Sequence, residues 1–124
     1  MKKILVIDDS DTVRQHVRET LAGAGYDIIE AIDGVDGLEK VQQINDLSLA
    51  LCDVNMPRMT GLEMVAELHR LGTLIPIIML TTEGQPSLIR RARDAGAKGW
   101  IVKPFKAELL LEAVNKLVNG AARR

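Results

Sequence analysis

The sequence predicts a three-layer α/β domain in which helices cover both faces of a parallel sheet. Short apolar runs alternate along the chain with segments whose apolar residues recur at every third or fourth position. Most of the runs are continuous rather than alternating, which is typical of strands buried on both faces. The chain has 124 residues, of which 47% are hydrophobic and 27% charged, and this suffices for one core and one domain.

Five apolar runs are predicted to be strands: residues 4–7, 28–32, 49–52, 75–80 and 100–102. The intervening helical spacing covers residues 13–21, 35–44, 62–68, 88–92 and 110–117. The expected helix starts are Ser10 or Asp11, Thr60 and Pro86, and the expected stops are Gly25, Gly72 and Gly96. Strand and helix therefore alternate five times, which favours right-handed crossovers and places any chemistry beyond the carboxyl ends of the strands.

The charge and the apolar pattern argue against two classes of protein. The 16 basic and 17 acidic residues give a net charge of −1, which disfavours a nucleic-acid partner. The longest apolar stretch, residues 74–80, is interrupted by Pro76 and is far shorter than the ~20 residues that span a bilayer. The first apolar run is too short for a signal peptide, and the single cysteine, Cys52, fits a reducing compartment. We expect a cytoplasmic protein without membrane insertion.

Polar side chains that could bind a ligand or react follow four of the predicted strands. They are Asp8 and Asp9, Asp53, Thr81 and Thr82, and Lys103 with Pro104. Three converging carboxylates repel one another, so a cation is expected among them: either Lys103 or a divalent metal. Oxygen ligands without paired histidines or cysteines favour Mg²⁺ over Zn²⁺. Metal, lysine and hydroxyl together would cradle a phosphoryl group, and a carboxylate inside that cradle could accept it.

These motifs, in this order and spacing, resemble the receiver domain of two-component response regulators over essentially the whole chain. The resemblance implies a flavodoxin-like (βα)5 sandwich with strand order 2-1-3-4-5. It also implies a single receiver domain over residues 1–124 without an output domain. Such a chain would not be an enzyme, apart from assisting its own phosphorylation and dephosphorylation.

The resemblance also assigns roles to individual residues. Asp53 would accept a phosphoryl group from a histidine kinase, and Mg²⁺ would be held by Asp8, Asp9, Asp53 and the carbonyl of Asn55. The implied phosphoryl-binding and switch residues are Thr81, Thr82, Lys103 and Trp100, the last at the switch aromatic position. Pro104 would follow a peptide bond that is often cis in the family. Asn55 and Glu83 would tune the rate at which the phosphoryl group hydrolyses.

Residues 96–105 and the segment Thr81-Thr82-Glu83 resemble the chemotaxis receivers in particular. This implies a histidine kinase of the chemotaxis type as phosphodonor and a monomeric regulator. A docking protein, such as a motor switch protein, would bind the face formed by the fourth helix, fifth strand and fifth helix. Val54 departs from the tryptophan of enteric chemotaxis receivers, and Ser10-Asp11 from their Phe-Ser. These departures bear on partners rather than on the mechanism.

Other functions remain open at the level of the sequence. A receiver of this kind could instead act as a phosphate sink or a phosphorelay intermediate. Residues 9–13 also match the D-x-D-x-[TV] pattern of haloacid-dehalogenase-type phosphatases, although no acid follows Lys103 before Glu108. A flavodoxin-like FMN protein is disfavoured because Asp8 and Asp9 would repel a phosphate. His16 and His69 lack a second histidine at ligand spacing, so we expect structural or solvated roles for both.

Overall fold

The computed structural model describes residues 1–120 and confirms the predicted α/β sandwich. The strands are β1 (Lys3–Ile7), β2 (Asp27–Ala31), β3 (Leu47–Cys52), β4 (Ile77–Thr81) and β5 (Gly99–Val102). The helices are α1 (Asp11–Ala22), α2 (Gly34–Gln43), α3 (Gly61–Arg70), α4 (Pro86–Ala95) and α5 (Ala107–Gly120). All strand pairs are parallel, and the order β2-β1-β3-β4-β5 is the one that the resemblance implied. Residues 121–124 of the predicted domain lie outside the described residues.

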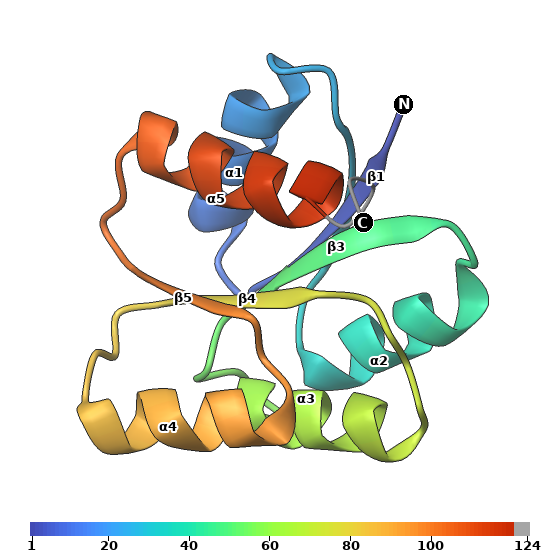
Figure 1. The fold of residues 1–124 in the computed structure, drawn as a ribbon, viewed down its shortest axis with the longest axis vertical. Helices are drawn as coiled ribbons and strands as arrows, with labels where there is room; N and C mark the ends of the chain where they lie inside the picture. The colour runs from blue at the N-terminus through green and yellow to red at the C-terminus, as the bar shows by residue number, and fades with distance from the viewer. Residues whose placement is uncertain (121–124) are drawn as a thin grey trace.

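Two hydrophobic clusters lie on opposite faces of the sheet. In Figure 1, α1 and α5 cover one face, and α2, α3 and α4 cover the other. Successive residues of β1 alternate between the clusters, so that Ile4 and Val6 face α1 and α5 while Leu5 and Ile7 face the other layer. A central parallel strand is therefore apolar at every position, which explains the continuous runs in the sequence.

The predicted helix starts are present, and Gly72 and Gly96 follow the ends of α3 and α4, whereas α1 already ends at Ala22, three residues before the predicted stop at Gly25. The Ser10 hydroxyl accepts a hydrogen bond from the backbone N–H of Val13, and Thr60 forms a reciprocal capping box with Glu63. Pro86 begins α4, and Gly96 ends it in the left-handed conformation. These local signals fix where α1, α3 and α4 begin, and α1 and α3 begin directly beside the strand ends that carry the polar residues.

Some predicted strand limits differ from those observed. The second strand is not buried on both faces, because β2 is an edge strand; Ile32 lies beyond its end and is 54% exposed. The fourth strand begins at Ile77 rather than at residue 75, and it includes Thr81. The third strand begins at Leu47, two residues before the predicted start. Within residues 1–120, none of the helices has both the length and the apolar character needed to cross a membrane.

Candidate functional site

The predicted site residues meet where the parallel strands end. The backbone N–H of Asp53 donates to the carbonyl of Ile7 (3.0 Å), and that of Lys103 donates to the carbonyl of Thr81 (2.8 Å). These bonds continue the pairing of β1 with β3 and of β4 with β5 by one residue. Parallel pairing therefore places the first residue after each of these strands at one edge of the sheet.

Three carboxylates converge at this edge. Asp8, Asp9 and Asp53 each offer an oxygen, and these oxygens all lie within 4.8 Å of one another. Asp8 and Asp53 are buried, whereas Asp9 is exposed. The remaining oxygens of the buried pair are oriented by the backbone: Ser10 N–H donates to Asp8 Oδ1 (2.9 Å), and Val54 N–H donates to Asp53 Oδ1 (2.7 Å). Each buried acid thus has one oxygen held by the chain and one directed into the site.

Lys103 joins the two buried acids. Its Nζ donates to Asp8 Oδ2 at 3.0 Å and to Asp53 Oδ2 at 3.3 Å, and its side chain is 13% exposed. One ammonium group therefore serves two carboxylates while a third lies close by. The peptide bond that follows, between Lys103 and Pro104, is cis, as the resemblance suggested.

The pKa shifts in this group reflect burial together with the neighbouring charges. Burial raises the pKa of Asp8, and the hydrogen bonds from Ser10 and Lys103 offset only part of that effect. Burial alone would lower the pKa of Lys103, but its hydrogen bond to Asp8 and the charges of Asp8 and Asp53 raise the net value. Both groups therefore hold their protons more tightly, Asp8 chiefly because it is buried and Lys103 because two carboxylates lie beside it. Burial also raises the pKa of the neighbouring Cys52 thiol, which stays protonated and packs in the core as predicted.

The donor set fits Mg²⁺. The converging atoms are all oxygens, their net charge is negative, and Asp9 at the rim leaves the cluster open to solvent. Mg²⁺ prefers such hard ligands and usually keeps several waters, so an open carboxylate cluster suits it better than a closed cage. Asn55 is exposed in the loop after β3.

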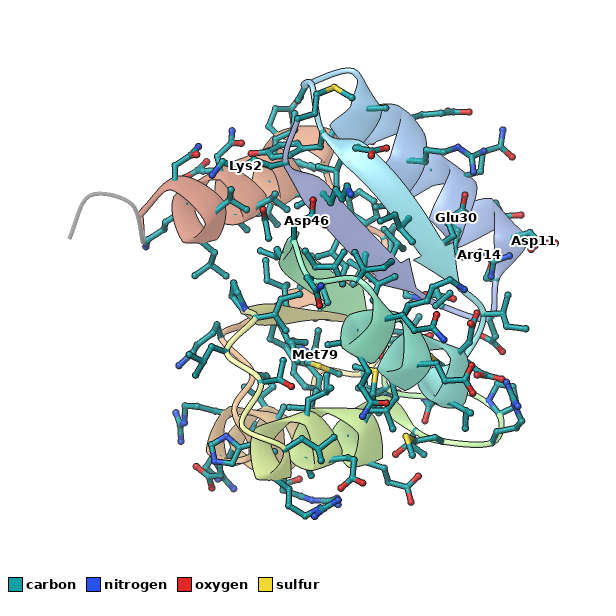
Figure 2. All side chains as sticks on the ribbon, turned by 90° about the vertical axis from the view of Figure 1, so that its right-hand side faces the viewer. Lys2, Asp11, Arg14, Glu30, Asp46 and Met79 are labelled. Carbon is teal, nitrogen blue, oxygen red and sulfur yellow. The ribbon has the colours of Figure 1, made fainter. Side chains whose placement is uncertain are left out.

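Arg14, which the sequence did not single out, supports the turn that carries Asp8 and Asp9, two of the predicted metal ligands. This buried guanidinium donates to the Asp8 carbonyl, to the Asp11 carboxylate and, at 3.0 Å, to Glu30 Oε1. Figure 2 shows Asp11, Arg14 and Glu30 close together beside β2. The signal was present, because Arg14 lies on the same helical face as the buried Val17 and Leu21. A cation on a core-facing position needs partners, and here they are the Asp8 carbonyl and the carboxylates of Asp11 and Glu30.

The predicted switch residues form a second group on β4 and β5 and in the loops that follow them. Thr81 is fully buried and its hydroxyl accepts from Glu83 N–H (3.3 Å), while Trp100 Nε1–H donates to the Glu83 carbonyl (2.8 Å). Thr81 and Trp100 are thus linked through the backbone of Glu83. Thr82 is exposed and lines an apolar groove of about 340 Å³ together with Lys103, whereas Trp100 packs half-buried against the helical layer of α3 and α4.

The two histidines have the structural or solvated character expected of them. Both are exposed, and His16 stacks on Phe105 with ring centroids 4.8 Å apart. Arg90, Arg91 and Arg93 lie on the exposed face of α4.

Comparisons with known proteins agree with this geometry. The family profile described as the response regulator receiver domain matches residues 4–115. The chemotaxis protein CheY1 of Helicobacter pylori is 42% identical over 113 residues, covering 89% of this chain and 91% of that protein. CheY of Bacillus subtilis is 36% identical over 118 residues, covering 94% and 98%. The solved structure of chemotaxis response regulator CheY4 of Vibrio cholerae superposes with a TM-score of 0.87 at 41% identity, covering 94% and 98%.

A match of this extent favours the receiver reading over the phosphatase and flavodoxin alternatives. The strand order, the carboxylate cluster at the sheet edge and the profile match describe the same domain. The chain therefore belongs to the response regulator receiver domain family of two-component signalling, as a CheY-like receiver of the chemotaxis type.

Proposed function

We propose that this receiver is switched by phosphorylation of Asp53, with a histidine kinase of the chemotaxis type as phosphodonor. The observation that carries the proposal is the position of Lys103 Nζ between Asp8 Oδ2 and Asp53 Oδ2. A buried carboxylate can accept a phosphoryl group, and its charge would be held by the ammonium on one side and by a cation bound to the further carboxylates on the other.

The metal site would use the carboxylates of Asp8, Asp9 and Asp53 together with the backbone carbonyl of Asn55. When bound, Mg²⁺ would neutralise negative charge that builds up on the transferring phosphoryl oxygens. Asp53 Oδ1 remains held by the N–H of Val54, so its carboxylate keeps one orientation while Oδ2 reacts. Orientation of this kind lowers the entropic part of the barrier.

The transfer itself makes one bond and breaks one. An Asp53 carboxylate oxygen attacks phosphorus, the bond from phosphorus to the donor imidazole nitrogen breaks, and its electron pair returns to the imidazole. The product is a mixed anhydride, which water later hydrolyses to the free carboxylate and phosphate. Lys103 exchanges its contact with Asp53 for a phosphoryl oxygen, a movement that suits a point charge on a flexible stem. Asn55 and Glu83 are the proposed positions that tune the hydrolysis.

The signal would then pass through Thr81. Its hydroxyl already accepts from Glu83 N–H, so its own proton can be donated to a phosphoryl oxygen, while Thr82 lines the groove beside Lys103. Because the carbonyl of Glu83 also accepts from Trp100, a movement of Thr81 would alter the packing of the indole. This would reshape the face of α4, β5 and α5, where we propose that a partner protein docks on the monomeric regulator.

Phosphorylation with acetyl phosphate tests this proposal. Peptide mapping by mass spectrometry should find the adduct on Asp53 only, and only when Mg²⁺ is present. Asp53→Asn should abolish labelling, whereas Asp46→Asn, which changes an exposed acid paired with Lys3, should not. Labelling at Asp9, or steady turnover of phosphate monoesters, would instead support a phosphatase and contradict the proposal.

A further inference from the structure

A strained residue lies in the loop that joins β3 to α3. Among residues 1–120, Arg58 is the only non-glycine residue with a positive φ, at 66°. Side chains other than glycine adopt this left-handed region rarely, and a residue persists there only where its surroundings hold it.

The Arg58 guanidinium is bound to one carboxylate by two hydrogen bonds. Its Nε donates to Asp33 Oδ2 at 2.6 Å, and its Nη2 donates to Asp33 Oδ1 at 3.0 Å. The Asp33 side chain is only 4% exposed, whereas that of Arg58 is 57% exposed. Two parallel hydrogen bonds fix direction as well as distance, so this pair restrains the loop more than a single contact would.

Asp33 is itself a rigid anchor. It caps α2, because its Oδ1 accepts from Asp36 N–H (2.9 Å) and its carbonyl accepts from Gly37 N–H (2.9 Å). The next residue, Gly34, is pressed against the same loop: a Cβ there would lie 2.4 Å from the carbonyl oxygen of Met59. Arg58 and Met59 are thus both held against the first turn of α2.

The restrained loop is the one that carries the phosphoacceptor and a proposed metal ligand. It leaves β3 at Asp53 and enters α3 at Gly61, whose N–H donates to the carbonyl of Val54 (2.8 Å). A Cβ at Gly61 would lie 2.0 Å from the carbonyl oxygen of Asp53, so the two ends of the loop are in contact. Between these ends lies Asn55, whose carbonyl must point at the carboxylate cluster if it is to bind the metal.

We infer that Arg58 is a positioning residue for the Mg²⁺ site, acting through its ion pair with Asp33 to hold the Asn55 carbonyl in the binding conformation. The inference rests on the proposed function. Both of these side-chain hydrogen bonds of Arg58 go to Asp33 at the start of α2. Arg58 would therefore act indirectly, by raising the fraction of molecules in which the loop has the Mg²⁺-binding conformation. If that population falls, the apparent dissociation constant for Mg²⁺ rises in inverse proportion.

Calorimetric titration with MgCl₂ at fixed ionic strength tests the inference on two variants. Arg58→Asn removes the guanidinium but leaves a residue that tolerates the left-handed region. Asp33→Asn removes the charge but keeps a residue able to cap α2. We expect each variant to bind Mg²⁺ about threefold to tenfold more weakly. The double variant should be no weaker than the weaker single variant, because both changes break the same pair.

The signs of these effects separate positioning from simple electrostatics. Removing the cation Arg58 should by charge alone strengthen Mg²⁺ binding, whereas removing the anion Asp33 should weaken it. Positioning predicts weakening in both. Arg70→Ala is a matched control, since Arg70 binds Glu67 with the same pair of distances, 2.6 and 3.0 Å, on the exposed face of α3. The control should leave Mg²⁺ affinity unchanged.

Hydrogen exchange provides a readout that does not depend on the metal. Without Mg²⁺, the amides of residues 54–59 should exchange faster in Arg58→Asn than in the wild type, and those of α5 should not. Arg58→Gly serves if the asparagine variant folds poorly, because glycine adopts a positive φ freely. Opposite shifts of Mg²⁺ affinity in the two single variants, or affinities equal to that of the wild type, would overturn the inference alone. A wild-type chain that binds no Mg²⁺ would overturn the proposed metal site and the inference with it.

Discussion

Asp8 and Asp33 follow neighbouring parallel strands at the same edge of the sheet, yet their charges are balanced in different ways. Both are almost fully buried, at 2% and 3% exposure, and both bind a cationic side chain. Burial raises the pKa of Asp8 in spite of Lys103. The hydrogen bonds from Arg58 lower the pKa of Asp33 in spite of its burial.

Desolvation is the largest cause of the pKa shift at Asp8, whereas the hydrogen bonds from Arg58 are the largest cause at Asp33. The two sites also differ in how many acids each cation serves. Arg58 gives two hydrogen bonds to one carboxylate, whereas Lys103 divides its contacts between Asp8 and Asp53 while Asp9 adds further negative charge. The charge of Asp33 is matched by one cation, whereas the three acids around Lys103 carry more negative charge than that lysine neutralises. Burial of an acid therefore does not by itself indicate a binding site, whereas a cluster of acids with excess negative charge supports the proposed metal site.

The largest expected effect is on metal binding. Asp8→Asn should weaken Mg²⁺ binding by more than about 100-fold, because loss of an outer-shell partner alone typically costs 10- to 100-fold. Labelling of Asp53 by acetyl phosphate should fall in parallel. The corresponding change at the balanced site, Asp33→Asn, should cost about tenfold at most. Equal losses in the two variants, measured by calorimetry, would remove the distinction between the sites.

For folding stability, in contrast to Mg²⁺ binding, we expect a larger loss from a change at Asp33 than from a change at Asp8. Asp33→Ala removes both an N-cap and the partner of Arg58, so we expect a loss of about 1–2 kcal/mol in the free energy of unfolding. Asp46→Ala, which breaks only the exposed pair with Lys3, should cost less than about 0.5 kcal/mol. Urea unfolding measures both values. A loss at Asp33 no larger than that at Asp46 would mean that the ion pair does not restrain the fold.

Removing Lys103 should leave the carboxylates of Asp8 and Asp53 without their neighbouring positive charge. Lys103→Ala takes away the cation that competes with Mg²⁺, so the variant should bind Mg²⁺ as tightly as the wild type or up to about tenfold more tightly. It should nevertheless fail to switch after phosphorylation. Lys40→Ala, which breaks an ion pair on α2, is the control and should behave as wild type. A Lys103→Ala variant that signals normally would place Lys103 outside the mechanism.

The smallest expected effect is optical. Trp100 is the only tryptophan, so its fluorescence reports the link through Glu83 directly. Beryllium fluoride with Mg²⁺ should change the emission or its quenching by iodide, and Thr81→Ala should reduce that change while Asp53 still accepts phosphate. An unchanged signal on full phosphorylation, with partner binding still enhanced, would show that the output uses another face.

The sequence predicts the site better than it predicts the supports of the site. Asp8, Asp53 and Lys103 could be grouped because the carboxyl ends of parallel strands meet at one edge. The Ser10 and Thr60 caps were predictable because their partners are local. The ion pair of Arg58 with Asp33 was not, since it joins two loops and no residue type announces a positive φ at an arginine. The exposure of Ile32 depends on the strand order, which hydrophobic periodicity does not contain.

The contribution of each acid to the free energy of unfolding depends on pH, with opposite signs for Asp33 and Asp8. The pKa of Asp33 is lowered, so its stabilising contribution is present above the ordinary value of 3.8 and is lost as the pH falls through the folded-state pKa. The pKa of Asp8 is raised, so the free energy of unfolding falls as the pH rises from 3.8 through the raised value. At neutral pH without metal, the ionised Asp8 carboxylate should therefore cost folding stability, whereas the raised pKa of Lys103 adds stability that is lost only as the pH rises through that pKa.

Urea unfolding of the wild type and Asp8→Asn near pH 7, with and without Mg²⁺, tests the unbalanced cluster most directly. Without Mg²⁺, Asp8→Asn should be the more stable protein, and its advantage should shrink as the pH approaches 3.8. With Mg²⁺ at about 100 times its dissociation constant, the wild type should gain about 2.7 kcal/mol and the variant almost nothing. A metal-free Asp8→Asn that is less stable than the wild type, or a gain with Mg²⁺ that is equal in both proteins, would contradict a charge-unbalanced metal site at Asp8.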